Sequence, residues 1–223
     1  MKNNTAINIV NLHNSKTNIT MKRIITTLAC AVLIASTAFA QTSVGAGYLN
    51  SIDVVKSGNS TNSDPLNGFY AGVSFTVPVA SGINFNPGLY YGYAAKSSAA
   101  DLIITTLSGK REDHFLHVPL HFSYGLDLSR DFRFFAYAGP SVSFGLASRV
   151  TGSIGGNSSA SDRYQSDSNL NRFDIMLGGG AGVEVMRQFR IQVGYDFGML
   201  NRYNNTNTAY RRNQLTAGVA YLF

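Results

Sequence analysis

The last ten residues of the chain alternate between apolar side chains and small or polar ones. Counted back from the end, the apolar positions are Phe223, Tyr221, Val219, Ala217 and Leu215. A period of two residues predicts a β-strand with one apolar face. Such a strand promotes aggregation when it forms an exposed sheet edge, whereas a barrel closed inside lipid has no edge. We therefore expect a membrane barrel, of which this stretch is the last strand.

Seven further segments show the same alternation. With the last one, the expected strands are 43–49, 68–79, 83–95, 114–126, 132–146, 172–185, 189–200 and 210–223. Long polar loops are expected at 50–67, 96–112, 147–171 and 201–209, with short turns between the other strands. Outer-membrane barrels alternate short periplasmic turns with long external loops in this way. The predicted fold is all-β, an eight-stranded antiparallel up-and-down transmembrane β-barrel.

Charge and composition agree with a sheet whose outer face meets lipid. Charged residues make up 13% of the chain, against roughly 25% in ordinary globular proteins. The chain carries a net charge of +6, but from Gln41 onward 14 basic and 12 acidic residues leave only +2. No basic run remains in that part of the sequence, so we expect no binding of nucleic acid.

The segment before residue 41 has the pattern of an export signal. Lys22 and Arg23 precede an uncharged, mostly apolar run over 24–39, which ends in a small-x-small pattern at Ala40. A positive start, a short apolar core and small residues at the end predict cleavage between Ala40 and Gln41.

The sequence thus divides into three predicted parts. Residues 1–20 are a leader or precede the true start, 21–40 form the signal peptide, and 41–223 form the outer-membrane barrel domain. Cys30 lies in the signal peptide, in a context that disfavours lipidation. Without it the mature chain has no cysteine, which excludes disulfides and thiolate metal sites.

Four short motifs in the later strands resemble one known family. They are Leu116-His117-Val118-Pro119-Leu120, Ala138-Gly139-Pro140-Ser141, Phe173-Asp174 with Gly180-Ala181-Gly182-Val183-Glu184, and Tyr195-Asp196-Phe197-Gly198 with Asn201. In this order and spacing, they are similar to those of the PorT-like small outer-membrane barrel proteins. The resemblance implies the barrel fold and an outer-membrane location, and we do not extend it to a role in secretion.

The end of the chain also resembles a recognition signal. Thr216, Gly218, Tyr221 and Phe223 follow the polar-x-Gly-x-x-apolar-x-apolar pattern that the barrel-assembly machinery reads in such proteins. The resemblance implies that machinery as a partner.

Five charged residues fall at positions expected to face the lumen: Arg133, Glu184, Arg190, Asp174 and Asp196. The first three lie near short turns, and the two aspartates lie nearer the outside. Buried charges must pair, and eight strands leave an interior just wide enough for side chains. We therefore favour a salt-bridged plug over the alternative, a gated or selective pore.

Histidines and glycines suggest other chemistry, which we consider weaker. His117 and His121 share a face but lie about 13 Å apart along a strand, too far to bind one metal ion together. A hydrolase with His117 and Ser123 or Ser141 lacks a supporting motif. The glycine-rich run 178–182 lacks the Lys-Ser/Thr of a phosphate loop, and in a barrel strand glycine makes room for bulky inward groups.

These patterns together predict a structural or interaction barrel without enzymatic activity, cofactor or metal. The expected partners are outer-membrane lipid, the assembly machinery and an envelope or extracellular protein that contacts the four long loops. A narrow porin-like channel or a component of a secretion assembly is the alternative, and an outer-membrane hydrolase is a weaker one.

Overall fold

The computed structural model describes residues 41–101, 106–154, 157–164, 170–203 and 208–223. The chain divides into two units, Met1–Ala40 and Gln41–Phe223, and all described residues belong to the second. The predicted leader and signal peptide therefore lie outside the described residues. Within the described part, no helix is long and apolar enough to cross a bilayer.

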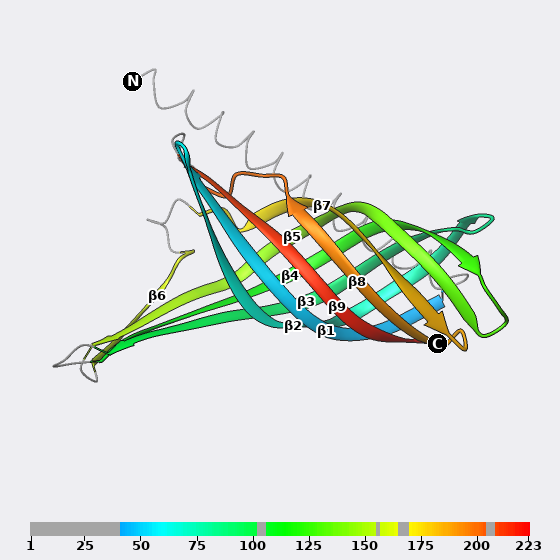
Figure 1. Ribbon diagram of the computed structural model, residues 1–223, viewed down its shortest axis with the longest axis horizontal. Coiled ribbons are helices and arrows are strands. Elements are labelled where there is room, and N and C mark those ends of the chain that lie inside the picture. Colours follow the sequence, from blue (N-terminus) through cyan, green and yellow to red (C-terminus); the bar gives the residue numbers. More distant parts are fainter. Residues whose placement is uncertain (1–40, 102–105, 155–156, 165–169, 204–207) are drawn as a thin grey trace, which may run out of the picture. The chain divides into compact units, whose positions relative to one another are not determined.

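The second unit is an antiparallel sheet that closes into a ring. Its strands are β1 (Gln41–Ser57), β2 (Ser60–Ala80), β3 (Ile83–Asp101), β4 (Thr106–Asp127), β5 (Phe132–Ile154), β6 (Asn157–Asp162), β7 (Phe173–Val185), β8 (Phe189–Gly198) and β9 (Thr208–Leu222). Among the described strands, β6 pairs with β5 alone, and the other eight form the ring β1–β2–β3–β4–β5–β7–β8–β9 (Figure 1). This confirms the predicted eight-stranded barrel.

The ring closes where the last strand pairs with the first. The register of β9 with β1 runs from Ser43↔Leu222 to Ser57↔Thr208 without a shift. Closure gives every strand of the ring two neighbours, so the backbone amides at membrane depth are satisfied within the sheet.

The apolar side chains of the ring point outward. Val219, Leu177 and Ile191 expose 59%, 52% and 52% of their surface. Aromatic residues of the outer face gather near both ends of the ring, for example Phe189 with Tyr221 at one end and Phe69 with Tyr93 at the other, each pair 5.5 Å apart between ring centroids. An apolar band between two aromatic girdles is the outer surface that lipid requires.

The short connections β2–β3, β4–β5 and β7–β8 lie at one end of the barrel, together with the C-terminus. We call this end the turn end. Backbone amides tie it together: Phe223 N donates to Thr42 O, and Leu222 N donates to Gln188 O. The β7–β8 turn contains Met186 and Arg187 with φ of 53° and 57°, the conformation of a type I′ hairpin turn.

At the opposite end, which we call the loop end, several predicted loops are strands instead. Residues 50–67 form a continuous hairpin whose turn has Gly58 at φ 56°. Most of 96–112 belongs to β3 and β4, and much of 147–171 belongs to β5 and β6. These segments were expected to be loops because they lack an apolar face. A strand beyond the membrane has water on its outer face and needs none.

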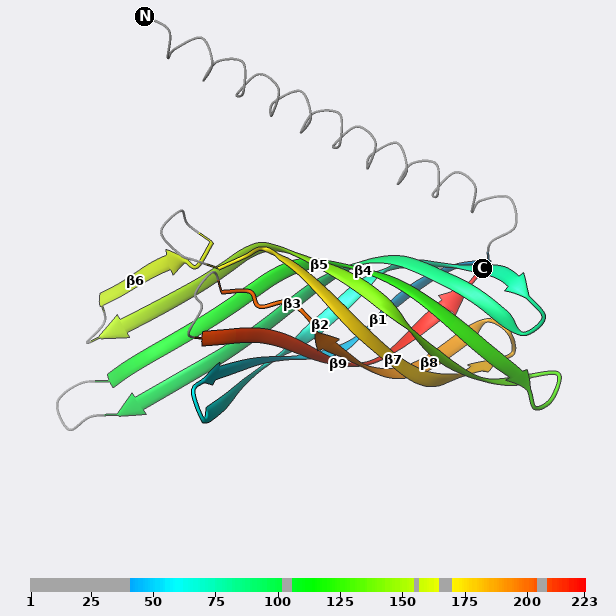
Figure 2. The same cartoon turned by 90° about the horizontal axis from the view of Figure 1, so that it is seen from above.

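These extensions make one side of the barrel taller than the rest. The β2–β3 pairing ends at Asn67↔Ala95, whereas β3–β4 continues to Asp101↔Thr106 and β4–β5 continues to Leu107↔Ile154. Figure 2 shows β3, β4, β5 and β6 reaching past the other strands at the loop end. We call this sheet of β3–β6 the wall.

Candidate functional site: the barrel lumen

Near the turn end, three of the predicted lumen charges meet. Arg190 donates from Nε and Nη2 to Glu184 Oε1 at 3.1 and 2.6 Å, and Arg133 Nη1 lies 3.6 Å from Glu184 Oε2. Arg190 also donates to Thr76 Oγ1 at 3.3 Å, and its guanidinium lies 5.0 Å from the centre of the Phe135 ring. Arg190 and Glu184 are each 7% exposed. We call Arg133, Glu184 and Arg190 the turn-end layer.

The other two predicted residues lie elsewhere in the lumen. Asp196 is buried at mid-barrel, where Ser141 Oγ donates to its Oδ1 at 3.4 Å and His121 Nε2 lies 3.7 Å from the same oxygen. Asp174 lies on β7 toward the loop end, 4.0 Å from Arg202 Nε. The five predicted lumen charges therefore lie at three levels of the barrel.

A larger charged network fills the lumen toward the loop end. Arg212 donates from Nε to Asp53 Oδ1 at 3.2 Å and from Nη2 to Asp113 Oδ2 at 2.6 Å. Arg111 Nη2 donates to the same oxygen of Asp113 at 2.6 Å and also contacts Asp53. Tyr210 donates its hydroxyl to Asp53. We call Asp53, Arg111, Asp113, Arg212 and Tyr210 the loop-end layer.

Residues from the external connections continue this network. Arg202 is 1% exposed and donates from Nη2 to the Tyr164 hydroxyl at 2.7 Å. Tyr164 packs with Leu170 and Tyr210 in a small apolar cluster. The side chains of two external connections therefore rest on the loop-end layer.

The loop-end layer was not predicted from the sequence, because Asp53 and Arg111 fell in predicted loops. A signal for it was present, since each acidic member continues the inward spacing of its strand. Asp53 follows Ser51 by two residues, and Asp113 precedes Phe115 by two. All four side chains are buried, so the two-residue period could have been followed beyond its apolar part.

Asp53 has a perturbed acidity and lies beyond the membrane-spanning part of β1. It follows Tyr48, a residue of the outer aromatic level, by five residues. Burial alone would raise the pKa of Asp53, but the positive charges of Arg212 and Arg111 outweigh it and lower the pKa from 3.8 to about 2. The carboxylate is therefore ionised at neutral pH and serves as an anionic partner of both arginines.

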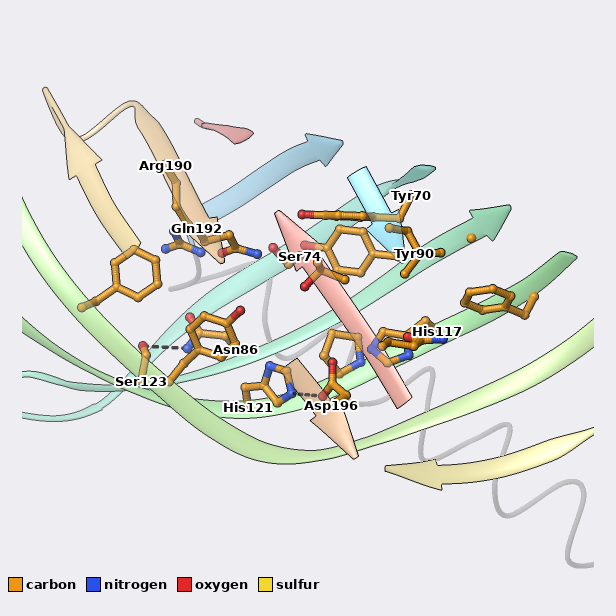
Figure 3. Close-up of a pocket in the computed structure, with 18 residues that line it drawn as sticks. Tyr70, Ser74, Asn86, Tyr90, His117, His121, Ser123, Arg190, Gln192 and Asp196 are labelled. Carbon is orange, nitrogen blue, oxygen red and sulfur yellow. Dashed lines mark hydrogen bonds and ion pairs between the residues drawn. The ribbon is translucent and has the colours of Figure 1, made fainter. Parts of the chain in front are cut away.

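A cavity of about 80 Å³ separates the two layers. Its lining includes Tyr70, Tyr90, His117, His121 and Asp196, which come from four different strands (Figure 3). The inward tyrosines need glycine opposite them, because a Cβ on Gly194 would overlap the Tyr137 hydroxyl and a Cβ on Gly218 would overlap that of Tyr70. The predicted role of the barrel glycines, to admit bulky inward groups, holds at these positions.

The polar groups of the cavity do not have the order of a hydrolytic triad. In such a triad the histidine lies between the nucleophile and the carboxylate. Here Asp196 lies between Ser141 and His121, and Ser123 accepts a hydrogen bond from Asn86 Nδ2 at 2.7 Å. Within the described residues, no group of three or more His, Cys, Asp or Glu side chains is arranged to hold a metal ion.

The four residues of the predicted assembly signal divide between the two faces of β9. Thr216 and Gly218 face inward: Thr216 Oγ1 donates to Gly194 O at 3.4 Å, and Gly218 lies against the hydroxyl of Tyr70. Tyr221 and Phe223 point outward, 40% and 71% exposed, with ring centroids 5.0 Å apart.

A closed antiparallel ring with an apolar exterior and a charged, side-chain-filled interior defines a bacterial outer-membrane β-barrel. Residues 37–204 match the family described as outer membrane protein beta-barrel domain, and the chain belongs to that family. A search of curated proteins finds no match.

Solved structures similar to this chain are small bacterial barrels. Ail of Yersinia pestis, in complex with the heparin analogue sucrose octasulfate, is 13% identical over 83% of this chain and 99% of that chain, with a TM-score of 0.44. Neisserial surface protein A is 18% identical over 82% and 99%, with a TM-score of 0.43. The outer-membrane enzyme PagL is 12% identical over 78% and 98%, with a TM-score of 0.40. Similarity at this level carries no argument about activity.

Proposed function

We propose that this outer-membrane barrel is a closed structural and interaction protein that neither transports solutes nor catalyses a reaction. The observation that carries the proposal is the filled lumen. Ion pairs cross it at two levels, and their charged groups are almost fully buried. A barrel of eight strands has room for such side chains and little else.

The positions of the polar side chains in the lumen support a role other than catalysis. The buried histidines, serines and Asp196 lie inside the lumen, and Asp196 occupies the place that a triad reserves for histidine. A lipid or ester substrate would have to pass one of the charged layers to reach them. The alternative of a hydrolase therefore has no support in the geometry of the described residues.

The surface best suited to a partner is the wall. It extends β3, β4 and β5 beyond the rest of the barrel and adds β6 at its edge. Edge strands with free backbone groups pair readily with other chains. In our proposal, an envelope or extracellular protein contacts the wall and the neighbouring external connections, and a PorT-like part in a secretion assembly is one form of that role.

We further propose how the chain reaches the outer membrane. The chain is exported by a signal peptide cleaved between Ala40 and Gln41, and Thr216, Gly218, Tyr221 and Phe223 direct assembly into the outer membrane. Aromatic side chains that point out of the last strand, as Tyr221 and Phe223 do, are accessible to an assembly factor.

Current recordings of the purified barrel in planar bilayers test whether the lumen is closed. We expect no resolved current steps, and reproducible ion-sized channels would support the alternative of a narrow pore.

Purification from outer membranes in mild detergent tests the interaction role. A stoichiometric envelope protein that is lost when the wall is shortened to the height of the other strands supports that role, whereas a barrel that always purifies alone contradicts it.

A further inference from the structure

Four buried polar atoms around the mid-barrel cavity have no hydrogen-bond partner among the described residues. They are Asn86 Oδ1, His117 Nδ1, His121 Nε2 and Gln214 Nε2, and all four residues line the cavity. Buried polar groups are normally hydrogen-bonded, and an unpaired one costs about 1–3 kcal/mol. Several such atoms around one space indicate that the space holds a hydrogen-bonding occupant.

The charge of the lining indicates which occupant fits. One cation, Arg190, and one carboxylate, Asp196, line the cavity, and its remaining polar residues are uncharged or histidine. A lining with balanced charge does not favour an ion. The unpaired atoms include an amide donor on Gln214 and an amide acceptor on Asn86, and water can satisfy both. The volume of about 80 Å³ suits a small group of water molecules, which need far less space each.

The two charged layers border this cavity from opposite sides. Arg190 belongs to the turn-end layer and also lines the cavity. At the other side, Arg212 and Asp113 are each two residues from a lining residue, Gln214 and Phe115 respectively. The layers share no residue, and each is completed by its own ion pairs.

We infer that the cavity is a water-filled chamber closed by two independent seals in series, so that ions cross the barrel only when both layers are removed. The inference rests on the proposed closed barrel and deepens it. Because each seal blocks the path alone, loss of one leaves the other in place.

Two paired substitutions each remove the ion pair that completes one layer, without leaving a new unpaired charge. Glu184→Ala with Arg190→Ala opens the turn-end layer and leaves Arg133, which is partly exposed and whose Nε lies 4.0 Å from Asp127 Oδ1. Asp113→Ala with Arg212→Ala opens the loop-end layer and leaves Asp53 paired with Arg111. The matched control is Lys110→Ala with Glu112→Ala, an ion pair whose side chains are exposed at 51% and 25%.

The test records single-channel currents of each variant in planar bilayers, after heat-dependent gel mobility has shown that the variant is folded. We expect no current steps from the wild type, the control or either double variant, and discrete steps from the quadruple variant. Steps from one double variant alone would overturn the series arrangement and leave the closed wild-type barrel intact. Steps from the wild type would overturn the proposed function itself.

A second measurement addresses the chamber. Magnetisation transfer from water to the Gln214 side-chain amide, recorded by NMR in detergent micelles, is expected in the wild type and in the control variant. A folded quadruple variant without conductance, or absence of the water signal in the wild type, would overturn the inference.

Discussion

Arg212 of β9 and Asp53 of β1 lie directly opposite each other across the seam where the last strand meets the first. Arg212 Nε donates to Asp53 Oδ1 at 3.2 Å, and both side chains are buried. If the two strands slipped by one residue, one of these side chains would face the outer surface. The ion pair therefore favours a single register at the point where the barrel closes.

Replacement of Arg212 by Ala should destabilise the barrel strongly. Asp53 and Asp113 would then share Arg111 as a charge partner, and breaking a buried pair costs about 3–5 kcal/mol. Urea unfolding in detergent, followed by gel mobility, measures the change. Arg211→Ala is the matched control, because Arg211 is exposed on the other face of β9, and it should change stability by less than about 0.5 kcal/mol. Equal effects of the two variants would contradict the role of the pair.

Gly194→Ala should be destabilising because its Cβ would overlap the Tyr137 hydroxyl. Overpacking of this kind costs about 1–3 kcal/mol. Adding Tyr137→Phe removes the clashing oxygen and should restore part of the loss, which a double-mutant cycle detects. The control is Gly152→Ala, where a Cβ meets nothing within 4 Å. A cycle without coupling energy would show that Tyr137 does not pack against Gly194.

An arginine at position 193 tests the lipid-facing surface. Val193 is 53% exposed and lies midway along β8 between the outward aromatics Phe189 and Phe197. Arginine at the bilayer midplane costs about 2–4 kcal/mol, so Val193→Arg should lower the stability of the barrel in lipid vesicles by that amount. Val150→Arg, on the extension of β5 beyond the membrane, should have little effect. A tolerated arginine at 193 would place this face outside lipid.

Acid should weaken the seam over a defined pH window. The pKa of Asp53 is about 2 in the barrel, against its ordinary value of 3.8. A lowered pKa means that the stabilisation by Asp53 is complete above pH 3.8 and is lost as the pH falls toward 2. Unfolding free energies should therefore show a smaller acid-dependent loss for Asp53→Asn than for the wild type in this window. Identical profiles would mean that Asp53 is not held as a carboxylate by Arg212 and Arg111.

The proposed assembly signal predicts an effect in cells that is absent in purified protein. Phe223→Ala removes an outward ring that is 71% exposed, so it should lower the amount of folded barrel in the outer membrane several-fold. Refolding of the same variant into detergent should be close to that of the wild type. A refolding defect as large as the defect in cells would assign Phe223 a packing role instead.

Several features of the fold followed from local pattern. The alternation at Val219 and Tyr221 gave the correct outward face of β9, and the spacing of turns gave the ring of eight strands. The inward position of Arg190 and Glu184 followed from the same period. Their direct pairing, and the different levels of Asp174 and Asp196, depended on strand tilt and register, which cannot be read from the order of residues.

The sequence alone determined the architecture, because in lipid an apolar outer face and a complete set of backbone hydrogen bonds leave a closed barrel as the solution for alternating strands. The tertiary structure decided how the lumen is filled. Asp53, Arg111, Asp113 and Arg212 come from three strands far apart in the chain, and their pairing energy exists only after closure has brought them together where they are buried from bulk solvent.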